Sequence, residues 1–383
     1  MKRIKLIHED LNAGGGAERL AAASLEVLSE LDLSVDLVTF TKPNWNQLER
    51  IFGITKLRKY VNNVIRADIS SLLDEKNKAS VNNDYDIVMN AHGDILPSNM
   101  FGVRKENLIT YCHYPLVPEL IRSFKYDTVL RNYLKMCDYK FESLDKLRTK
   151  ALQVYNQMMN NSTVVTNSIF SSKAVKLYYP RTDPLIIYPP IDIDYFSRAV
   201  SSEGRENRIV VLGRFNPDKN IELALEVAKV LKGMNTKFEM SIVGNLSRIY
   251  YPYFNYLQKL IKVNGLSNMV DLKTNVDIND LLTLFGKSKV LFHPTIGEPF
   301  GMCIAEAMSA GLVPVVPSFG GNTEFVPRSL RYSNQRQAAK IILKSMNASL
   351  RQRFSLSNSV KKFGKERFKD NLKRLLSEKV VAP

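Results

Sequence analysis

Two glutamates eight residues apart bracket the expected start of a helix late in the chain. Residues 297–311 read GEPFGMCIAEAMSAG, with Glu298 before this helix and Glu306 inside it. Eight residues are slightly more than two helical turns, so the two carboxylates can contact opposite ends of one ligand. The helix start near Gly301 presents free N–H groups that suit a phosphate. The alternative is a Glu298 that only compensates the helix dipole and a Glu306 that lies at the surface.

Two cations stand five residues apart on a loop that follows an expected strand. Residues 213–220 read GRFNPDKN and contain Arg214 and Lys219. The guanidinium offers a fork of donors and the ammonium a point charge, which together suit the unequal oxygens of a diphosphate. The alternative is that Lys219 only pairs with Glu222 or Asp218 at the surface.

Three consecutive glycines form another candidate ligand loop near the start of the chain. Residues 14–19 read GGGAER and lie between the first expected strand and an amphipathic helix. Glycine lets backbone N–H groups, such as those of Gly15 and Gly16, approach a ligand closely, and a helix start favours an anion. The GxGxxG order of dinucleotide-binding loops is absent. A tight turn without a ligand is the alternative.

One histidine ends an expected strand at the place where parallel sheets bind ligands. Residues 107–115 read NLITYCHYP, which puts His113 at the carboxyl end of this strand. An imidazole can donate to a hydroxyl or carbonyl group without any metal. The alternative is a histidine with a purely structural role.

The sequence lacks the signals of metal, P-loop and hydrolase chemistry. His8, His92 and His293 show no metal-ligand spacing, and neither a GxxxxGK[ST] loop nor a GxSxG elbow is present. The Asp192–Asp194 pair resembles a DxD metal motif, but it follows two prolines, which favours a turn. We therefore expect neither a metal nor another cofactor.

Strands and helices alternate along the chain in two series, which predicts parallel sheets covered by helices on both faces. The two prolines of YPPIDID, residues 188–194, interrupt both the hydrogen bonds of a sheet and those of a helix. They therefore mark a linker between the two series. We predict two Rossmann-like α/β domains, 1–190 and 191–357, with their ligand edges facing the cleft between them, and a basic segment at 358–383. The expected strands are 4–8, 35–40, 86–92, 108–113, 163–166, 185–188, 209–213, 238–244, 270–275, 290–294 and 313–316.

The composition is that of a globular protein with an excess of basic residues. The 383 residues are 45% hydrophobic, and the three cysteines form no CxxC pair, which fits the cytosol. The net charge is +16, and residues 328–383 alone hold 15 basic and three acidic residues. Such a segment can face nucleic acid, anionic lipid, a phosphorylated substrate or only solvent. Because no nucleic-acid-binding module is recognisable, we expect no nucleic-acid partner. We also expect no signal peptide and no membrane-spanning helix.

The order of these motifs resembles the retaining glycosyltransferases of family 4, which have the GT-B fold. The motifs GGGAER, HYP, GRFxPxKN and EPFGxxxxEAMxAG lie between about residues 3 and 326. Residues 111–115, with the polar and helical stretch 119–160, are also similar to mannosyltransferases that extend dolichol-linked oligosaccharides on the cytosolic side of the membrane. The resemblance implies a nucleotide-sugar donor on the C-terminal domain, an acceptor on the N-terminal domain and no bound metal. It also implies that the last helix crosses back to the N-terminal domain.

The resemblance further implies a role for each candidate residue. Arg214 and Lys219 would hold the diphosphate and neutralise the leaving charge. Glu298 would contact the donor sugar, Glu306 the ribose hydroxyls, and His113 a sugar hydroxyl near the reacting carbon. The other implied donor contacts involve the glycine loop, the base site and the start of the helix: Gly15, Gly16, Asn275, Val276, Phe300, Gly301 and Met302.

The implied reaction is transfer of a hexose with retention of configuration, by front-side attack with the leaving phosphate as base. The HYP motif favours mannose from GDP-mannose, with UDP-sugars as the next candidates, and a glycan or lipid-linked acceptor. Aromatic residues within the basic segment suggest a cytoplasmic protein that binds peripherally to an anionic membrane surface. The alternatives are a sugar-nucleotide epimerase or hydrolase, an inactive partner of another transferase, and a nucleic-acid-binding protein.

Overall fold

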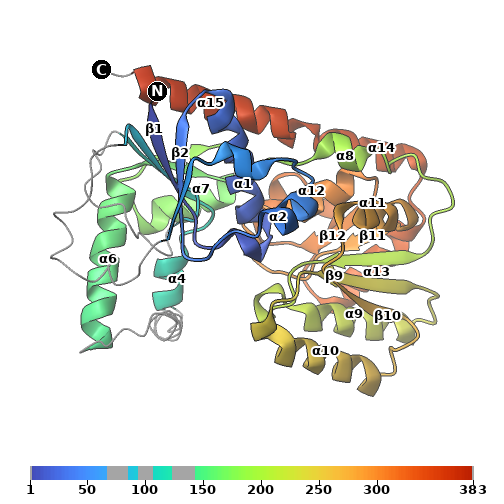
Figure 1. Cartoon of the computed structure of the whole chain (residues 1–383). Coiled ribbons are helices and arrows are strands. Elements are labelled where there is room, and N and C mark those ends of the chain that lie inside the picture. The colour runs from blue at the N-terminus through green and yellow to red at the C-terminus, as the bar shows by residue number, and fades with distance from the viewer. Residues whose placement is uncertain (1, 67–84, 94–106, 123–142, 382–383) are drawn as a thin grey trace. The chain divides into compact units, whose positions relative to one another are not determined.

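The computed structural model describes residues 2–66, 85–93, 107–122 and 143–381 (Figure 1). The chain divides into two units, each with its own parallel sheet. The first unit comprises residues 1–49, 54–188 and 368–383, and the second comprises residues 50–53 and 189–367. Among the described residues, no helix is both long and apolar enough to cross a bilayer.

The first unit contains a seven-stranded parallel sheet in the order β3-β2-β1-β4-β5-β6-β7. The order reverses between β1 and β4, and ligands of such sheets bind beside that reversal, at the carboxyl ends of the strands. The inner strands are almost wholly buried because helices cover both faces. The strands are β1 (Arg3–Ile7), β2 (Ser34–Thr39), β3 (Asn63–Arg66), β4 (Ile87–Asn90), β5 (Leu108–Cys112), β6 (Thr163–Thr166) and β7 (Leu185–Ile186).

The helices of the first unit lie on both sides of this sheet. One hydrophobic cluster joins α4, α6 and α7 to β1, β2, β4, β5 and β6. The helices are α1 (Gly16–Glu30), α2 (Trp45–Phe52, of which residues 45–49 belong to this unit), α4 (Leu116–Arg122), α6 (Leu144–Asn160) and α7 (Ile169–Tyr178). The stretch 119–160, expected to be helical, lies partly outside the described residues.

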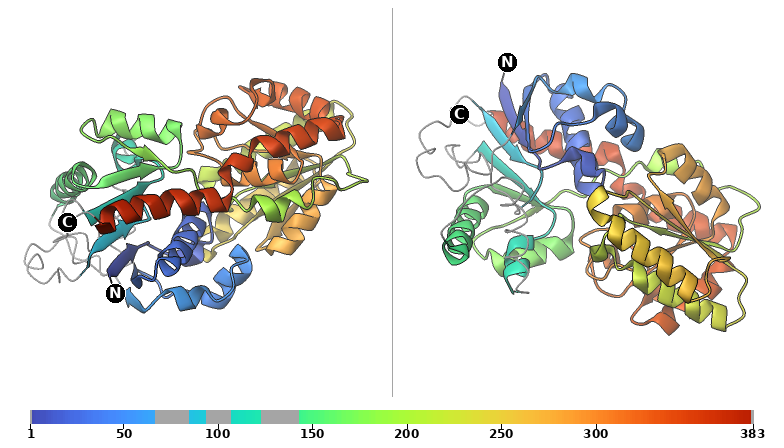
Figure 2. Two further views of the ribbon diagram at one scale, coloured as in Figure 1. Left: turned by 90° about the horizontal axis from the view of Figure 1, so that it is seen from above. Right: turned by 60° about the horizontal axis from the view of Figure 1, so that its bottom comes forward.

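The last helix, α15 (Lys365–Val381), runs beside α1, and residues from 368 onward belong to the first unit (Figure 2). The ammonium groups of Lys369 and Lys373 both contact the carboxylate of Glu30, the latter at 2.7 Å. Phe368 and Leu376 on the same helix are buried. Part of the basic segment is therefore paired and packed within the fold.

The second unit contains a six-stranded parallel sheet in the order β10-β9-β8-β11-β12-β13. In Figure 1, α9, α10 and α13 lie on one side of it and α8, α11, α12 and α14 on the other. The strands are β8 (Arg208–Leu212), β9 (Glu239–Gly244), β10 (Val270–Thr274), β11 (Val290–Phe292), β12 (Val313–Pro317) and β13 (Arg331–Tyr332). The helices are α8 (Ile193–Ser197), α9 (Ile221–Gly233), α10 (Tyr251–Val263), α11 (Ile278–Lys287), α12 (Met302–Ser309), α13 (Gln335–Met346) and α14 (Leu350–Ser359).

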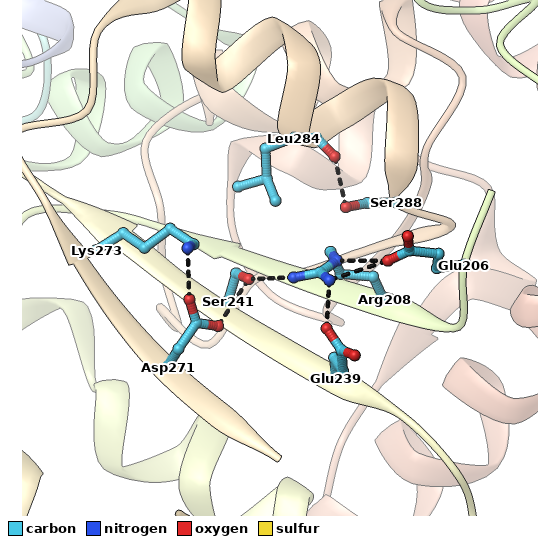
Figure 3. A network of polar contacts seen from close by, with 8 residues as sticks. All are labelled: Glu206, Arg208, Glu239, Ser241, Asp271, Lys273, Leu284 and Ser288. Atoms are coloured by element: carbon cyan, nitrogen blue, oxygen red, sulfur yellow. Dashed lines mark hydrogen bonds and ion pairs between the residues drawn. The ribbon is translucent and has the colours of Figure 1, made fainter. Parts of the chain in front are cut away.

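A polar network joins β8, β9 and β10 in the half of the sheet where these strands begin (Figure 3). Arg208 contacts Glu206 at 2.9 Å and donates to Ser241 at 3.2 Å, and it also contacts Glu239. Ser241 donates to Asp271 at 2.8 Å. These polar groups satisfy one another's hydrogen-bonding capacity and help to fix the register of the strands. The network lies near the amino ends of the strands, whereas the candidate site lies at their carboxyl ends.

Each expected strand overlaps an observed one, but the sequence did not predict β3 and β13. Both are short strands at the edge of their sheets, and neither has the apolar run on which the prediction depends. The turn expected at residues 192–194 is also wrong, because the short helix α8 begins at Ile193. Asp192 precedes this helix but makes no side-chain cap.

Candidate functional site

An ion pair joins the two most informative motifs of the second unit. The ammonium of Lys219 lies 2.8 Å from Oε2 of Glu298, and both side chains are largely buried. Lys219 ends a short 3-10 turn between β8 and α9, and Glu298 lies in the loop between β11 and α12. The surface pairing of Lys219 with Glu222 or Asp218 is therefore not what the structure shows.

The electrostatics of this pair favour its charged form. Burial alone would raise the pKa of Glu298, but the ammonium of Lys219 and the imidazole of His293 outweigh it and hold the pKa well below its ordinary value. Burial likewise opposes the charge on Lys219, yet Glu298 raises the pKa of this ammonium above its usual value. Both groups are therefore ionised at neutral pH.

A second loop fixes the backbone that carries Glu298. Gly321 N–H donates to the carbonyl of Glu298 at 2.8 Å, and Gly297 N–H donates to the carbonyl of Phe319 at 3.2 Å. A Cβ on Gly321 would lie only 1.9 Å from the carbonyl oxygen of Pro299. Only glycine fits this approach, so the loop after β12 is part of the scaffold of the site.

Helix α12 begins beside Glu298 and has no side-chain cap. Gly301 precedes it with φ of 94°, a left-handed conformation that glycine adopts readily. Phe300 is buried against Phe325 and Phe363, which anchors the helix start. An uncapped helix start can accept an anion, because its first N–H groups point outward along the helix dipole.

Glu306 lies in the middle of α12 and is only 3% exposed. The surface position considered as an alternative for this residue is therefore wrong. The neighbouring thiol of Cys303 is partly buried, and its desolvation together with Glu298 and Glu306 raises its pKa to about 12. Cys303 therefore stays protonated at neutral pH.

The other expected donor residues of the second unit lie on loops at strand ends. Arg214 is exposed, and the loop that carries it passes so close to β9 that a Cβ on Gly244 would lie 1.9 Å from the carbonyl oxygen of Gly213. Asn275, with φ of 54°, directly follows β10, and its side chain accepts from Leu246 N–H at 3.1 Å. Val276 follows and is partly buried.

The glycine loop of the first unit begins α1, as expected. The carboxylate of Glu18 accepts from Gly15 N–H at 2.6 Å, so an acidic side chain already occupies this position at the helix start. Gly16 is the first residue of the helix. The loop is therefore held by its own helix.

His113 directly follows β5, and its Nε2 lies 3.0 Å from the carbonyl oxygen of Ala91. Because that oxygen accepts, Nε2 carries the proton. Burial lowers the pKa of His113 to about 4, although the Ala91 carbonyl partly opposes this effect. His113 is therefore a neutral imidazole at neutral pH.

Two further histidines lie near His113, and sequence reasoning considered them only as metal ligands. His8 is fully buried, with its ring edge-on to His92 at 5.1 Å and its Nε2 3.8 Å from Glu18. Burial lowers the pKa of His8 well below its ordinary value, and His92 and His113 lower it further. His92 contacts Glu9 at 2.7 Å. Within the described part of the chain, no three His, Cys, Asp or Glu side chains gather as a metal site requires.

The four histidines of the chain share one signal that sequence reasoning used only for His113. His8, His113 and His293 each directly follow a strand, and His92 follows β4 by two residues. Each therefore lies at the ligand-binding edge of a parallel sheet. His293 is the histidine that touches Glu298, at 3.4 Å.

Comparison with known proteins agrees with this architecture. Residues 192–363 match the family described as "Glycosyl transferases group 1". These residues lie within the second unit.

Curated relatives carry mannosyltransferase names. A "GDP-Man:Man(3)GlcNAc(2)-PP-Dol alpha-1,2-mannosyltransferase" of Dictyostelium discoideum is 23% identical over 57% of this chain and 47% of its own length. An alpha-1,3/1,6-mannosyltransferase of Rhizomucor pusillus is 22% identical over 57% of this chain and 53% of its own length. The chain thus spans about half of these relatives.

Solved structures resemble the whole chain and establish its fold. HepE of Anabaena, in complex with UDP and glucose, has a TM-score of 0.70 at 16% identity and covers 99% of this chain and 100% of its own. A glycosyltransferase from Rickettsia africae has a TM-score of 0.71 at 15% identity, over 100% of this chain and 99% of its own. The chain has the GT-B fold, with two Rossmann-like parallel-sheet domains, as the sequence predicted.

Proposed function

We propose that this chain is a retaining glycosyltransferase that moves a hexose from a nucleotide-sugar to a hydroxyl of a glycan or lipid-linked acceptor. The favoured donor is GDP-mannose, because the matching relatives are named as GDP-mannose-dependent or other mannosyltransferases. The observation that carries the proposal is the buried Lys219–Glu298 pair beside the uncapped start of α12. This arrangement offers cationic and N–H donors to a diphosphate next to a carboxylate for sugar hydroxyls.

In this proposal the diphosphate binds between the two cationic side chains and the helix. Lys219 and Arg214 pair with its oxygens, and N–H groups of Phe300, Gly301 and Met302 contact phosphate and sugar. Electrostatic stabilisation of this kind is usually the largest contribution to catalysis, and losing one donor costs roughly 3–4 kcal/mol of barrier. Glu298, ionised in the structure, accepts from the hydroxyls of the donor sugar.

The remaining contacts with the nucleotide-sugar are assigned from the place of each residue in the fold. Glu306 accepts from the ribose hydroxyls, and Asn275 and Val276 flank the base, where the turn after β10 exposes the backbone. For Gly15 and Gly16 of the first unit, the proposal keeps the donor contact that the family resemblance implies. A neutral His113 bonds a sugar hydroxyl and does not compete with the cationic residues for the phosphates.

The reaction then proceeds by front-side attack. The bond from the anomeric carbon to the diphosphate breaks through an oxocarbenium-like state, and the departing oxygen takes the proton of the acceptor hydroxyl. The new glycosidic bond forms on the same face, which retains the configuration. We propose that these side chains neutralise the leaving charge without a metal ion.

We extend the proposal to peripheral binding at an anionic membrane surface, which suits a lipid-linked acceptor. The support is a group of exposed basic side chains around the start of α15 and along it: Lys361, Lys362, Arg367 and Arg374. Co-flotation with vesicles that contain anionic lipid, lost in high salt, is the expected result. Absence of binding at low salt would contradict this part.

A UDP-sugar donor is the second candidate, because the similar HepE structure contains UDP and glucose. A thermal-shift screen with GDP-mannose, UDP-glucose and UDP-N-acetylglucosamine distinguishes the donors, since a ligand at about 100 times its Kd adds roughly 2.7 kcal/mol of stability. Nuclear magnetic resonance of the product then gives its anomeric configuration. An inverted product would refute retention, and no shift with any donor would refute the proposed function.

A further inference from the structure

His293 occupies a position that the proposed reaction does not yet use. It directly follows β11 and is only 2% exposed. Its N–H donates to the carbonyl of Val315 at 2.9 Å, and its carbonyl accepts from the hydroxyl of Tyr332 at 2.9 Å. The backbone on both sides of the side chain is therefore fixed, which restricts where the ring can point.

The ring lies between a thiol and the carboxylate of the site. Nε2 is 3.4 Å from Oε2 of Glu298, the oxygen that also binds Lys219. Nδ1 is 4.0 Å from the sulfur of Cys303. At 3.4 Å the contact with Glu298 is an electrostatic one and longer than a good hydrogen bond.

These neighbours favour one tautomer of the ring. A carboxylate beside Nε2 favours the proton on that nitrogen, which leaves Nδ1 as an acceptor. The thiol of Cys303 donates to the carbonyl of Leu212 at 3.7 Å and lies 4.0 Å from Nδ1, so it does not determine the tautomer. Among the described residues, Nε2 has no hydrogen-bond partner closer than this carboxylate.

Lys219 and His293 therefore share one carboxylate oxygen, and this sharing has a consequence when a diphosphate binds. Phosphate oxygens compete with Glu298 for the ammonium of Lys219. A carboxylate that loses its ammonium partner in a buried site would be destabilised or would turn away. A second donor that remains in place prevents both outcomes.

We propose that His293 is a positioning residue that holds Glu298 in its sugar-binding orientation when Lys219 turns toward the diphosphate. The imidazole carries its proton on Nε2 and closes the remaining few tenths of an ångström to Oε2 as Lys219 withdraws. The inference rests on the proposed function, because it assigns Glu298 to the donor sugar. It implies that His293 affects recognition of the sugar and not of the nucleotide.

The first experiment needs no substrate. Nitrogen-15 magnetic resonance of the full chain identifies which ring nitrogen of His293 carries the proton, with the His293→Gln variant used to assign the signal. We expect the Nε2–H tautomer in the wild-type protein and a loss of that preference in Glu298→Ala. A proton on Nδ1 in the wild-type protein, or an unchanged tautomer in Glu298→Ala, would overturn the inference.

The second experiment separates sugar from nucleotide. We compare binding of GDP and GDP-mannose, and of UDP and UDP-glucose, by calorimetry with wild-type protein, His293→Phe and His293→Gln. His293→Phe removes the donor, whereas glutamine keeps an N–H near the position of Nε2. We expect His293→Phe to weaken the nucleotide-sugar roughly tenfold while the affinity for the free nucleotide changes less than about twofold. His293→Gln is expected to restore much of the loss.

Three outcomes are decisive. Equal losses for nucleotide and nucleotide-sugar would show a merely structural role, and no loss for either would show no role in the site. If the wild-type protein binds none of these ligands, the proposed function fails, while the tautomer experiment still decides the contact with Glu298. Because His293→Phe can fail to fold, the tautomer experiment with the wild-type protein and Glu298→Ala tests the inference without that variant.

Discussion

At the scale of single residues, the Lys219–Glu298 pair is important because neither group tolerates the loss of the other. Both side chains are mostly withdrawn from water, at 24% and 15% exposure, and lie 2.8 Å apart. A buried pair is weak evidence for stability, since desolvation offsets much of the attraction. An unpaired charge left in such a site is costly, and this asymmetry can be measured.

We expect Lys219→Met to lower the free energy of unfolding by about 2 kcal/mol, because it leaves the carboxylate of Glu298 without its ammonium. The double variant Lys219→Met/Glu298→Gln should regain most of that loss. Urea unfolding followed by circular dichroism measures both values. Additive effects of the two substitutions would mean that the pair is not coupled.

The neutral histidines of the first unit predict a loss of stability in mild acid. The pKa of His113 falls from 6.5 to about 4 on folding, so the unfolded chain takes up the proton first. Stability should therefore be fully present above pH 6.5 and decrease as the pH falls toward 4, with His8 adding to the effect. Unfolding followed by the fluorescence of Trp45, the one tryptophan, reports on this unit.

His113→Gln keeps a side-chain N–H but does not titrate. Its stability should depend less on pH between 6.5 and 4 than that of the wild-type protein, by roughly 1–3 kcal/mol. Parallel pH curves for the two proteins would show that His113 gains no proton on unfolding.

Sequence reasoning found the charged residues of the site but not the groups that orient them. Glu298 and Lys219 stand out because a carboxylate before a helix start and a cation on a strand-to-helix loop are unusual local patterns. The contact of His293 with Glu298 depends on how the loop of residues 294–298 folds back to the end of β11. The spacing of these residues in the sequence does not predict that this loop folds back.

At the scale of elements, the loop after β12 acts as a template for the loop that carries Glu298. Gly321 passes so close to Pro299 that no side chain fits between them. The sequence gives no sign of this contact, because a glycine pair after a strand is also typical of an ordinary turn. The helices and inner strands were predictable because their apolar patterns are long, whereas β3 and β13 are short edge strands.

We expect Gly321→Ala to destabilise the protein by about 1–3 kcal/mol and to weaken binding of nucleotide-sugars, because the loop carrying Glu298 must shift. Gly233→Ala is the matched control, since a Cβ at this glycine of α9 would meet nothing within 4 Å. The control should be neutral or slightly stabilising. Thermal unfolding and calorimetry measure the two effects, and similar behaviour of the two variants would contradict the template role.

At the scale of the whole molecule, the chain builds two units and ends by adding α15 to the first. Alternating strands and helices and the double proline predicted two α/β domains. The placement of the last helix came from the resemblance alone, because its basic and apolar residues also suit a membrane surface. In the structure, its buried residues and the contacts of Lys369 and Lys373 with Glu30 tie it to the first unit.

Leu376 of α15 is fully buried, so Leu376→Ala should cost about 2–5 kcal/mol. Because residues 368–383 belong to the same unit as Trp45, this loss should appear in the fluorescence transition. Ile342→Ala, in the core of the second unit, should leave that transition nearly unchanged. Equal shifts for both variants would mean that the two units unfold together.

The central claim is that Arg214, Lys219 and the start of α12 bind a diphosphate. Calorimetric titration with GDP and GMP, repeated with UDP and UMP, tests it most directly because each pair differs by one phosphate. We expect the diphosphate of one pair to bind about tenfold more tightly, and the double variant Arg214→Ala/Lys219→Ala to lose that difference. Equal affinity of the wild-type protein for mono- and diphosphate would contradict the account.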